Sequence, residues 1–238
     1  MIELKNIEIL KKGIEAISSF IPEGNFRFTD NGIYFKSIDP SQIVLVDYFI
    51  DKKLFNKYDI ESNYIGIDLV ELNKIIQRAD VKDMMHIEIA DSELKLKFIS
   101  EMKRSFRLPL IDVKDLDVKL PEISYKTKIE ISALQFKEVL KDANLFGTSV
   151  VLKVENSKFF IEARGPQGVM DSDISSVSKI VSKENVLCKF SLNFLQSIVK
   201  ECENFEKITI ELKNDAAIKI SYHIGQTKIV FYLAHMIL

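Results

Sequence analysis

Hydrophobic residues recur every three or four positions in four stretches of the chain, and they alternate with polar residues between these stretches. The first spacing predicts amphipathic helices and the second predicts half-buried strands. The predicted helices are residues 6–20, 68–79, 133–145 and 191–202. The predicted strands are residues 25–29, 33–38, 42–50, 64–67, 85–90, 93–99, 103–109 and 127–131. This order favours an α+β fold, in which helices cover one face of antiparallel sheet.

Local signals support the ends of several predicted helices. Pro22 and Gly24 follow the first helix and stop it. Asp68 precedes the second helix as an N-cap, with Glu71 at the capping-box position. Ser132 caps the third helix in the same way.

The hydrophobic pattern occurs twice in the chain. The second and fourth helices match in Leu69/Leu192, Leu72/Leu195, Ile75/Ile198 and Ile76/Val199. The first and third helices match in Leu10/Phe136, Ile14/Leu140, Ile17/Ala143 and Phe20/Phe146. The matched positions are separated by roughly half the chain, which is far longer than the 20–50 residues of a solenoid repeat and is the size of a small domain. We therefore expect a tandem duplication whose function depends on what two equivalent halves build together.

The expected domains are residues 1–110 and 127–238, joined by a connecting segment at 111–126. In that segment Pro121 interrupts any strand and no hydrophobic period persists. The serine-rich stretch 172–182 is predicted to be an edge strand that runs into a loop.

Composition narrows the class of protein. The net charge of −2 excludes a globally basic protein but leaves room for a local basic stripe. Two cysteines, Cys188 and Cys202, lack metal-ligand spacing, so we expect them to be reduced and packed in the core. No hydrophobic run approaches the ~18–20 residues of a membrane span. We expect a protein of the cytoplasm or nucleoid that makes no membrane contact.

No enzyme signature occurs in the sequence. Phosphate-binding glycine loops, nucleophile elbows and zinc-binding HExxH helices are missing. The glycines of Gly165–Gly168 flank a proline that removes a donor, so a turn is expected there. His86, His223 and His235 are isolated. We therefore predict no catalytic residue, metal site or cofactor, and a binding role.

The four helices share lysine or arginine on the face opposite their hydrophobic stripe. The residues are Lys11, Lys12, Lys74, Arg78, Lys137, Lys141 and Lys200. Glutamates and aspartates lie on the same helices, so an ordinary solvated surface is the alternative. Lysines without stacking aromatic residues suit contact with phosphates and not the reading of bases.

Four segments in order resemble the sliding clamp of archaea and eukaryotes, proliferating cell nuclear antigen. LKKGIEAISSFI (10–21) resembles the first helix of that family, and NGIYFKSIDPSQIVLVDYFI (31–50) resembles its most recognisable strand–turn–strand segment. DLDVKLPEISY (115–125) is similar to its interdomain connecting loop, and IVFYLAHMIL (229–238) to its C-terminal strand and tail. The resemblance spans the whole chain and identifies it with the archaeal type.

The resemblance implies a trimeric ring of six similar clamp domains, with two helices per domain lining the hole and antiparallel sheets outside. Such a ring encircles duplex DNA without sequence specificity and serves replication and repair as a processivity factor. It tethers DNA polymerase, flap nuclease and ligase through peptide motifs, and a separate ATP-driven clamp loader opens it. Tethering raises the local concentration of these enzymes at DNA.

The resemblance also assigns residues. Lys11, Lys12, Lys74, Lys141 and Lys200 match positions that face DNA, whereas Arg78 and Lys137 lie near such positions. A groove for a glutamine-containing partner peptide is expected to use Ile38, Gln42, Ile43, Leu45, Val118, Leu120, Tyr232, Ala234, His235, Met236 and Ile237. The chain departs from the family pattern at His235, where the family has proline, and at Ala217, which replaces a groove proline.

The subunit contacts are expected at strands 102–109 and about 170–178. The first is basic and the second is acidic, which suits head-to-tail closure of a ring. Both strands are poor in large hydrophobic residues, so self-association is expected to be weak.

Three other interpretations remain open at this stage. The chain could be one subunit of a heterotrimeric clamp with sister subunits. It could be a duplicated α+β enzyme with a site between its halves, for which Asp39 and Asp47 are the best candidate pair. It could also be a protein-binding scaffold that never contacts DNA.

Overall fold

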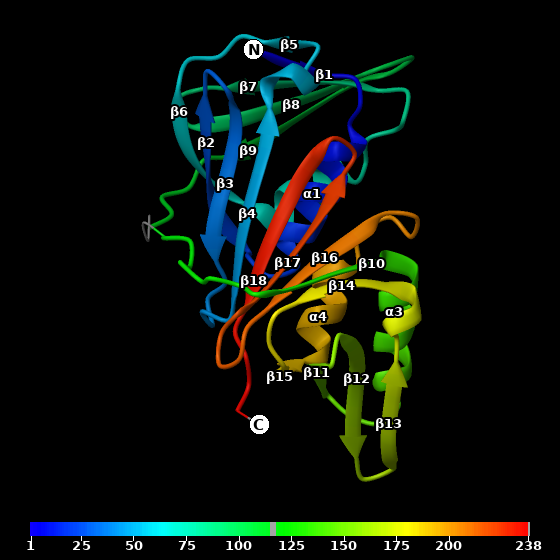
Figure 1. Cartoon of the computed structure of the whole chain (residues 1–238). Helices are drawn as coiled ribbons and strands as arrows, with labels where there is room; N and C mark the ends of the chain where they lie inside the picture. Colours follow the sequence, from blue (N-terminus) through cyan, green and yellow to red (C-terminus); the bar gives the residue numbers. More distant parts are fainter. Residues whose placement is uncertain (115–117, 238) are drawn as a thin grey trace. The chain divides into compact units, whose positions relative to one another are not determined.

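The computed structural model describes residues 1–114 and 118–237, so Asp115, Leu116 and Asp117 of the connecting segment and Leu238 lie outside the described residues. The chain forms two compact units (Figure 1). Unit 1 comprises Met1–Lys119 and Ile224–Ile229, and unit 2 comprises Leu120–His223 and Val230–Leu238. The main division after Lys119 falls inside the segment that the sequence marks as a connection.

Unit 1 contains two helices and antiparallel strands. The helices are α1 (Glu8–Ser18) and α2 (Leu69–Ile76). One sheet has the order β5-β1-β7-β8-β9, with β1 (Ile2–Leu4), β5 (Lys57–Tyr58), β7 (Met84–Ile89), β8 (Glu93–Ile99) and β9 (Lys103–Pro109). A second set of paired strands has the order β4-β3-β2-β6, with β2 (Glu23–Thr29), β3 (Gly32–Ile38), β4 (Val44–Asp51) and β6 (Asn63–Asp68).

Unit 2 repeats this plan. Its helices are α3 (Ala133–Ala143) and α4 (Leu192–Val199). One set of strands has the order β14-β10-β16-β17, with β10 (Thr127–Ser132), β14 (Ser178–Ser182), β16 (Lys207–Leu212) and β17 (Ile218–Ile224). The other has the order β13-β12-β11-β15, with β11 (Ser149–Glu155), β12 (Lys158–Gly165), β13 (Gly168–Asp173) and β15 (Val186–Ser191). The residues of β18 (Thr227–Leu233) and of β17 are divided between the two units.

The hydrophobic stripes of the helices form the cores of the units. Leu10, Ile14 and Ile17 of α1 are buried, and their predicted counterparts Phe136, Leu140 and Ala143 of α3 are buried as well. The burial of matched positions confirms the duplication at the level of packing. Among the described residues no helix is long and hydrophobic enough to cross a membrane.

Two predicted caps are confirmed by hydrogen bonds. The side chain of Asp68 accepts from the Glu71 amide at 2.9 Å, and that of Ser132 accepts from the Gln135 amide at 3.3 Å. Each cap satisfies an amide that the first turn of a helix leaves without an intrahelical partner. Helix α1 is shorter than predicted, because it begins at Glu8 and ends at Ser18.

Three local expectations have different outcomes. The predicted turn is confirmed, because β12 ends at Gly165 and β13 begins at Gly168. The stretch 172–182 begins, as predicted, with the end of an edge strand, β13, that runs into a 3₁₀ turn at Ser175–Val177, but the edge strand β14 that follows was not predicted. Strand β1 was not predicted, because only three residues near the terminus carry its pattern.

Candidate functional site

The basic residues of unit 1 lie on two adjacent helices but differ in their surroundings. The Lys11 ammonium donates to the Ala79 carbonyl at 3.2 Å, just beyond the end of α2. Lys12 is half-buried, while Lys74 and Arg78 are exposed. The Glu71 carboxylate accepts from Lys74 at 2.6 Å and raises the pKa of that lysine. Unit 1 therefore presents Lys74 and Arg78 to solvent and turns Lys11 toward the main chain.

In unit 2, as in unit 1, one lysine binds main-chain carbonyls and the other basic residues are exposed. The Lys137 ammonium donates to the carbonyls of Lys200 at 3.0 Å and of Cys202 at 2.6 Å, at the end of α4. Lys141 is exposed and pairs with Glu138 on α3, and the exposed Lys200, at the C-cap of α4, pairs with the adjacent Glu201. Lys137 thus occupies the place in unit 2 that Lys11 occupies in unit 1.

The predicted peptide-binding residues of unit 1 surround a tight turn between β3 and β4. The Asp39 side chain accepts hydrogen bonds from the amides of Ser41, Ile43 and Val44 at 2.9, 2.6 and 2.6 Å. These bonds hold Gln42 with a φ of 58°, a left-handed conformation that is uncommon outside glycine. Gln42 is exposed as a result.

The other predicted groove residues of unit 1 differ in exposure. Ile38 and Ile43 are half-buried, and Ile38 pairs with Leu45 across the two strands. Leu45 itself is buried, so its side chain belongs to the packed interior of this structure. Val118 is half-buried.

The predicted residues of unit 2 include an exposed C-terminal tail. Ala234, His235, Met236 and Ile237 are exposed, and the Met236 amide donates to the Lys189 carbonyl of β15 at 2.8 Å. Leu120 is exposed, whereas Tyr232 is buried. Near the departure at Ala217, the Tyr125 hydroxyl donates to the Ala217 carbonyl at 2.8 Å, and burial raises the pKa of Tyr125.

The carboxylates considered for an enzyme have other roles in the structure. Both Asp39 oxygens accept from main-chain amides of its own turn. Asp47 lies opposite Lys36 in the strand register, and burial raises its pKa while Lys36 opposes that rise. No group of three or more potential metal ligands occurs within the residues that the structure describes.

Both cysteines are packed in the interior, as predicted. Cys188 and Cys202 are buried, and the Cys188 thiol donates to the Lys213 carbonyl at 3.3 Å. Burial raises the pKa of Cys188 to about 11 and that of Cys202 to about 12. Such thiols remain protonated near neutral pH and are poor nucleophiles.

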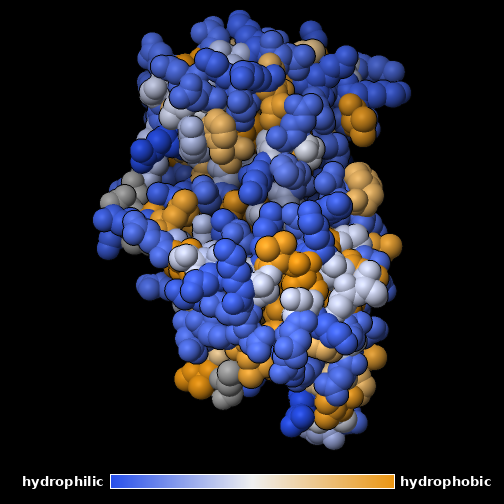
Figure 2. Space-filling model, in the orientation of Figure 1, coloured by the Kyte–Doolittle hydropathy of each residue, from blue (hydrophilic) through white to orange (hydrophobic). Residues whose placement is uncertain are grey.

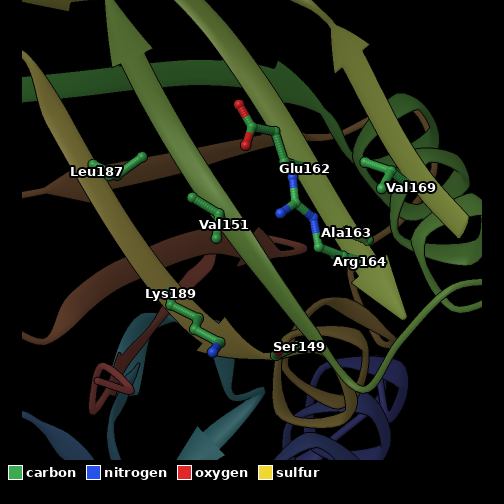
Figure 3. Close-up of a pocket in the computed structure, with 8 residues that line it drawn as sticks. All are labelled: Ser149, Val151, Glu162, Ala163, Arg164, Val169, Leu187 and Lys189. Atoms are coloured by element: carbon green, nitrogen blue, oxygen red, sulfur yellow. The ribbon is translucent and has the colours of Figure 1, made fainter. Parts of the chain in front are cut away.

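A shallow depression of about 420 Å³ lies on one face of the β13-β12-β11-β15 sheet (Figure 3). Val151, Leu187 and Val169 alternate there with the charged side chains of Glu162, Arg164 and Lys189. The lining mixes single charges with aliphatic groups and includes no histidine or cysteine. It is thus a surface of mixed polarity, with no nucleophile paired to a histidine base.

The first segment expected at subunit contacts is the edge strand β9, and the second, about 170–178, covers the end of the edge strand β13 and the 3₁₀ turn after it. Strand β9 ends the first sheet of unit 1, and β13 ends the second set of strands in unit 2. Lys103, Ser105 and Arg107 are exposed along β9, and Asp171 and Asp173 are exposed along β13. An unpaired edge of this kind can accept another strand.

Sequence reasoning did not find the hydrogen-bonded residues between the helices. In unit 1 the Gln77 amide nitrogen donates to Glu15 Oε2 at 3.0 Å and to Asn73 Oδ1 at 3.1 Å. In unit 2 the Gln196 amide nitrogen donates to the Leu140 carbonyl at 3.2 Å. These polar residues lie beside the hydrophobic stripes of the helices. The duplication was the one sequence signal that could have identified them, by comparing the residues at matched positions of the two halves.

The arrangement is that of a duplicated clamp protein, with a helix pair on sheet in each unit and open edge strands. Two family models match the chain: the N-terminal domain of proliferating cell nuclear antigen over residues 1–125 and its C-terminal domain over residues 119–237. The chain belongs to the proliferating cell nuclear antigen family.

Named relatives agree with this assignment. A protein of Methanococcus maripaludis named DNA polymerase sliding clamp is 32% identical over 240 residues, covering 96% of each chain. A protein of the same name from Thermococcus fumicolans is 30% identical over 228 residues, covering 93% of this chain and 92% of its own. A crystal structure of PCNA from Thermococcus kodakaraensis has a TM-score of 0.92, with 21% identity and 99% coverage of both chains. The last similarity establishes the fold, and together the matches support a sliding-clamp function.

Proposed function

We propose that the chain is a DNA sliding clamp that encircles duplex DNA as a ring of three subunits. The observation that carries this proposal is the pair of equivalent helix pairs, each with exposed basic residues, in a member of the clamp family. In such a ring the helices face the DNA and contact its phosphates without reading bases. The chain would act as a processivity factor in the nucleoid and would need no catalytic residue of its own.

Lys12, Lys74, Arg78, Lys141 and Lys200 are the residues proposed to face DNA. Lys74 and Lys141 form exposed ion pairs with Glu71 and Glu138. Exposed pairs contribute only about 0–1 kcal/mol, so a phosphate can replace the carboxylate. Lys11 and Lys137 are proposed to have a structural role in this surface. Each donates to a main-chain carbonyl just beyond the end of the neighbouring helix.

Ring closure is proposed to use the two edge strands. The exposed Lys103 and Arg107 of β9 would meet the exposed Asp171 and Asp173 of β13 on a neighbouring copy. Opposite charges across paired strands stabilise such a contact, and the scarcity of exposed hydrophobic residues on both strands keeps it modest.

Partner proteins are proposed to bind through short peptides that contain a glutamine and hydrophobic or aromatic anchors. Gln42 and Ile43 on the ordered turn of unit 1 supply one part of the binding surface. The exposed tail residues Ala234, His235 and Met236 supply another. DNA polymerase, flap nuclease, ligase and a clamp loader are the proposed partners.

The native mass of the purified chain across a dilution series tests the ring. Three copies of a 27.4 kDa chain have a mass of about 82 kDa. A trimer that dissociates on dilution is expected. A monomer at every concentration would contradict the homotrimer and favour the second candidate, a heterotrimeric clamp, for which the charged and weakly hydrophobic edges also provide a basis.

A further inference from the structure

Four side chains form a row across strands β6, β2, β3 and β4, which lie side by side in unit 1 (Figure 1). Tyr64 of β6 is opposite Arg27 of β2 in the strand register. Arg27 is in turn opposite Tyr34 of β3, which is opposite Phe49 of β4. The Arg27 guanidinium lies 5.2 Å from the centre of the Tyr64 ring. The Tyr34 and Phe49 rings are stacked, with their centres 4.2 Å apart. We call these four residues the aromatic row.

The aromatic row lies on the face of the sheet opposite to helix α2. Phe35, the residue after Tyr34, is buried. A Cβ added to Gly24 would meet both Phe35 and Leu69 of α2, so Phe35 points toward that helix. Successive residues of a strand point to opposite faces, and the row therefore points away from it. Tyr34 is 38% exposed and Tyr64 is 44% exposed. The proposed ring contact uses β9 and β13 and would leave this face uncovered.

The composition of the aromatic row is that of a binding surface. Cross-strand aromatic pairs stabilise a sheet, which accounts for the contacts between neighbours in the row. It does not account for the exposure of two tyrosines and an arginine on one rung. Tyrosine and arginine are enriched where partner proteins bind most strongly, because each combines a large hydrophobic surface with a polar group.

The exposed charges on the row and on the adjoining rung are positive. Arg27 in the row is exposed, and so is Lys36, two residues after Tyr34. Asp47, which is opposite Lys36, is half-buried. Asp51, on the other side of the row, is half-buried as well, and its carboxylate accepts a hydrogen bond from the main chain. This surface is therefore complementary to a partner segment that carries acidic residues.

The aromatic row is continuous with the proposed peptide-binding surface. Tyr34, Lys36 and Ile38 alternate along β3 and point to the same face. Ile38 pairs with Leu45, and both belong to the proposed peptide-binding residues. A strand rises about 3.3 Å per residue, so Ile38 lies about 13 Å from Tyr34, a distance that four to five residues of extended peptide span. Lys36, between them, is exposed, and this part of β3 is open to a partner.

The beginning of the connecting segment borders this path. The Ile111 amide donates to the Gly66 carbonyl of β6 at 3.0 Å. The Asn25 side-chain amide of β2 donates to the Val113 carbonyl at 3.0 Å. The connecting segment thus lies against β6 and β2, and a peptide can run beside it along β3 and β4.

We propose that the aromatic row is a second anchor for partner peptides, and that it binds an acidic segment with a hydrophobic or aromatic side chain next to the glutamine-containing motif. This inference rests on the proposed function and deepens it. The hydrophobic side chain would pack on the edges of the tyrosine rings, and carboxylates would pair with Arg27 and Lys36. Single-stranded nucleic acid fits less well, because bases stack on open ring faces and both pairs in the row already cover one face of a ring.

The test measures the binding of fluorescein-labelled synthetic peptides to the full chain by anisotropy. The core peptide carries a glutamine and aromatic anchors. Two longer peptides add alternating aspartate and phenylalanine residues to its N-terminus or to its C-terminus. Tyr34→Ser with Tyr64→Ser removes the tyrosines of the row. Phe205→Ser, which removes an aromatic side chain that is 80% exposed in unit 2, is the matched control.

One of the two extended peptides should bind the parent chain about tenfold more tightly than the core peptide, because it gains a second anchor. The tyrosine variant should bind the extended and core peptides equally, and the Phe205→Ser variant should keep the tenfold difference.

A charge exchange makes the test independent of folding. Arg27→Glu with Lys36→Glu should abolish the gain from the aspartate-containing extension. The same variant should regain it with a peptide in which lysine replaces each aspartate, because the charges are again opposite. A misfolded variant could not show this recovery.

Three results would overturn the inference, and they can be distinguished. If Ile43→Glu abolishes binding of the core peptide but neither extension improves it, the proposed groove stands and the row is not an anchor. If no peptide binds the parent chain, the proposed peptide-binding function fails together with the row. If labelled oligothymidylate binds the parent but not the tyrosine variant, and neither extension improves binding, the row is a nucleic-acid surface.

Discussion

Single residues in this chain fix the geometry of the surfaces proposed for binding. Asp39 is the clearest case, because one buried carboxylate accepts three main-chain amides and thereby orients Gln42. The sequence offered Asp39 as a catalytic candidate, since a carboxylate near another carboxylate has that pattern. The structure gives it a local architectural role instead.

Replacing Asp39 with alanine should destabilise unit 1 by about 2 kcal/mol, because hydrogen bonds to a charged group are worth about 1.5–3 kcal/mol. The measurement is the midpoint of denaturant unfolding. Asp51→Ala is the matched control, since Asp51 accepts one bond from the Lys53 amide in an exposed position and should cost less than about 1 kcal/mol. Equal losses for both variants would contradict the role of Asp39.

Asp47 should make stability depend on pH. Burial raises the pKa of this carboxyl in the folded state. The ionised carboxylate therefore lowers the stability of the protein above the folded pKa, and the residue has no effect on stability below the ordinary value of 3.8, where it is protonated in both states. Asp47→Asn should therefore raise the thermal midpoint at pH 7. The gain should vanish as the pH falls below about 3.8. A variant that is less stable than the parent at pH 7 would show that the Lys36 attraction outweighs burial.

At the scale of elements, the helices depend on close contacts with the sheets beneath them. A Cβ added to Gly13 of α1 would lie 2.6 Å from Tyr48 Cε1. Tyr48 is buried, and its hydroxyl lies 3.2 Å from the Ile9 carbonyl and 3.0 Å from Thr227 Oγ1. The ring therefore has little freedom to move away.

Gly13→Ala should destabilise the protein, even though alanine gains about 1 kcal/mol in helix propensity. Overpacking against a fixed ring costs about 1–3 kcal/mol, so a net loss of about 1 kcal/mol is expected. A double-mutant cycle with Tyr48→Leu is the check. In that background the alanine should be neutral or stabilising, and a loss of the same size in both backgrounds would contradict the packing argument.

The elements also show how far the sequence could be interpreted. The hydrophobic period located the four α-helices that the described residues form. The capping residues Asp68 and Ser132 marked where two of them begin, because a cap acts within three residues and needs no distant contact. Strands β1 and β14 were not predicted, because their pairing is decided by strands remote in sequence.

The candidate site shows the same limit. The lysines were found by their position opposite the hydrophobic stripe. The direction of Lys11 toward Ala79 could not be predicted, because it depends on where another helix ends.

At the scale of the whole molecule, surface composition is consistent with a protein that binds through charge. Figure 2 shows hydrophilic residues over most of the visible face, with hydrophobic residues in small separate patches. The edge strands β9 and β13 have the same kind of surface, since their exposed residues are mainly charged or small.

Charge exchange at the edges tests the proposed ring contact. Lys103→Glu with Arg107→Glu should abolish trimers, because it places like charges beside Asp171 and Asp173 of the neighbour. Asp171→Lys with Asp173→Lys should do the same. In each variant the two edge strands carry charges of the same sign, so copies of one variant repel each other. In a mixture, the edges of the two variants carry opposite charges, and light scattering should detect larger assemblies again. Unchanged trimers in either single preparation would place the contact elsewhere.

The central claim, that the chain holds DNA topologically, is tested most directly by its retention on circular and linear duplexes. The protein would be loaded on nicked circular DNA with a clamp loader and ATP and then separated by gel filtration. Most of it should travel with the circle and be lost after a single restriction cut, because a ring slides off a free end. Equal retention on circular and linear DNA would contradict the account and indicate ordinary electrostatic binding.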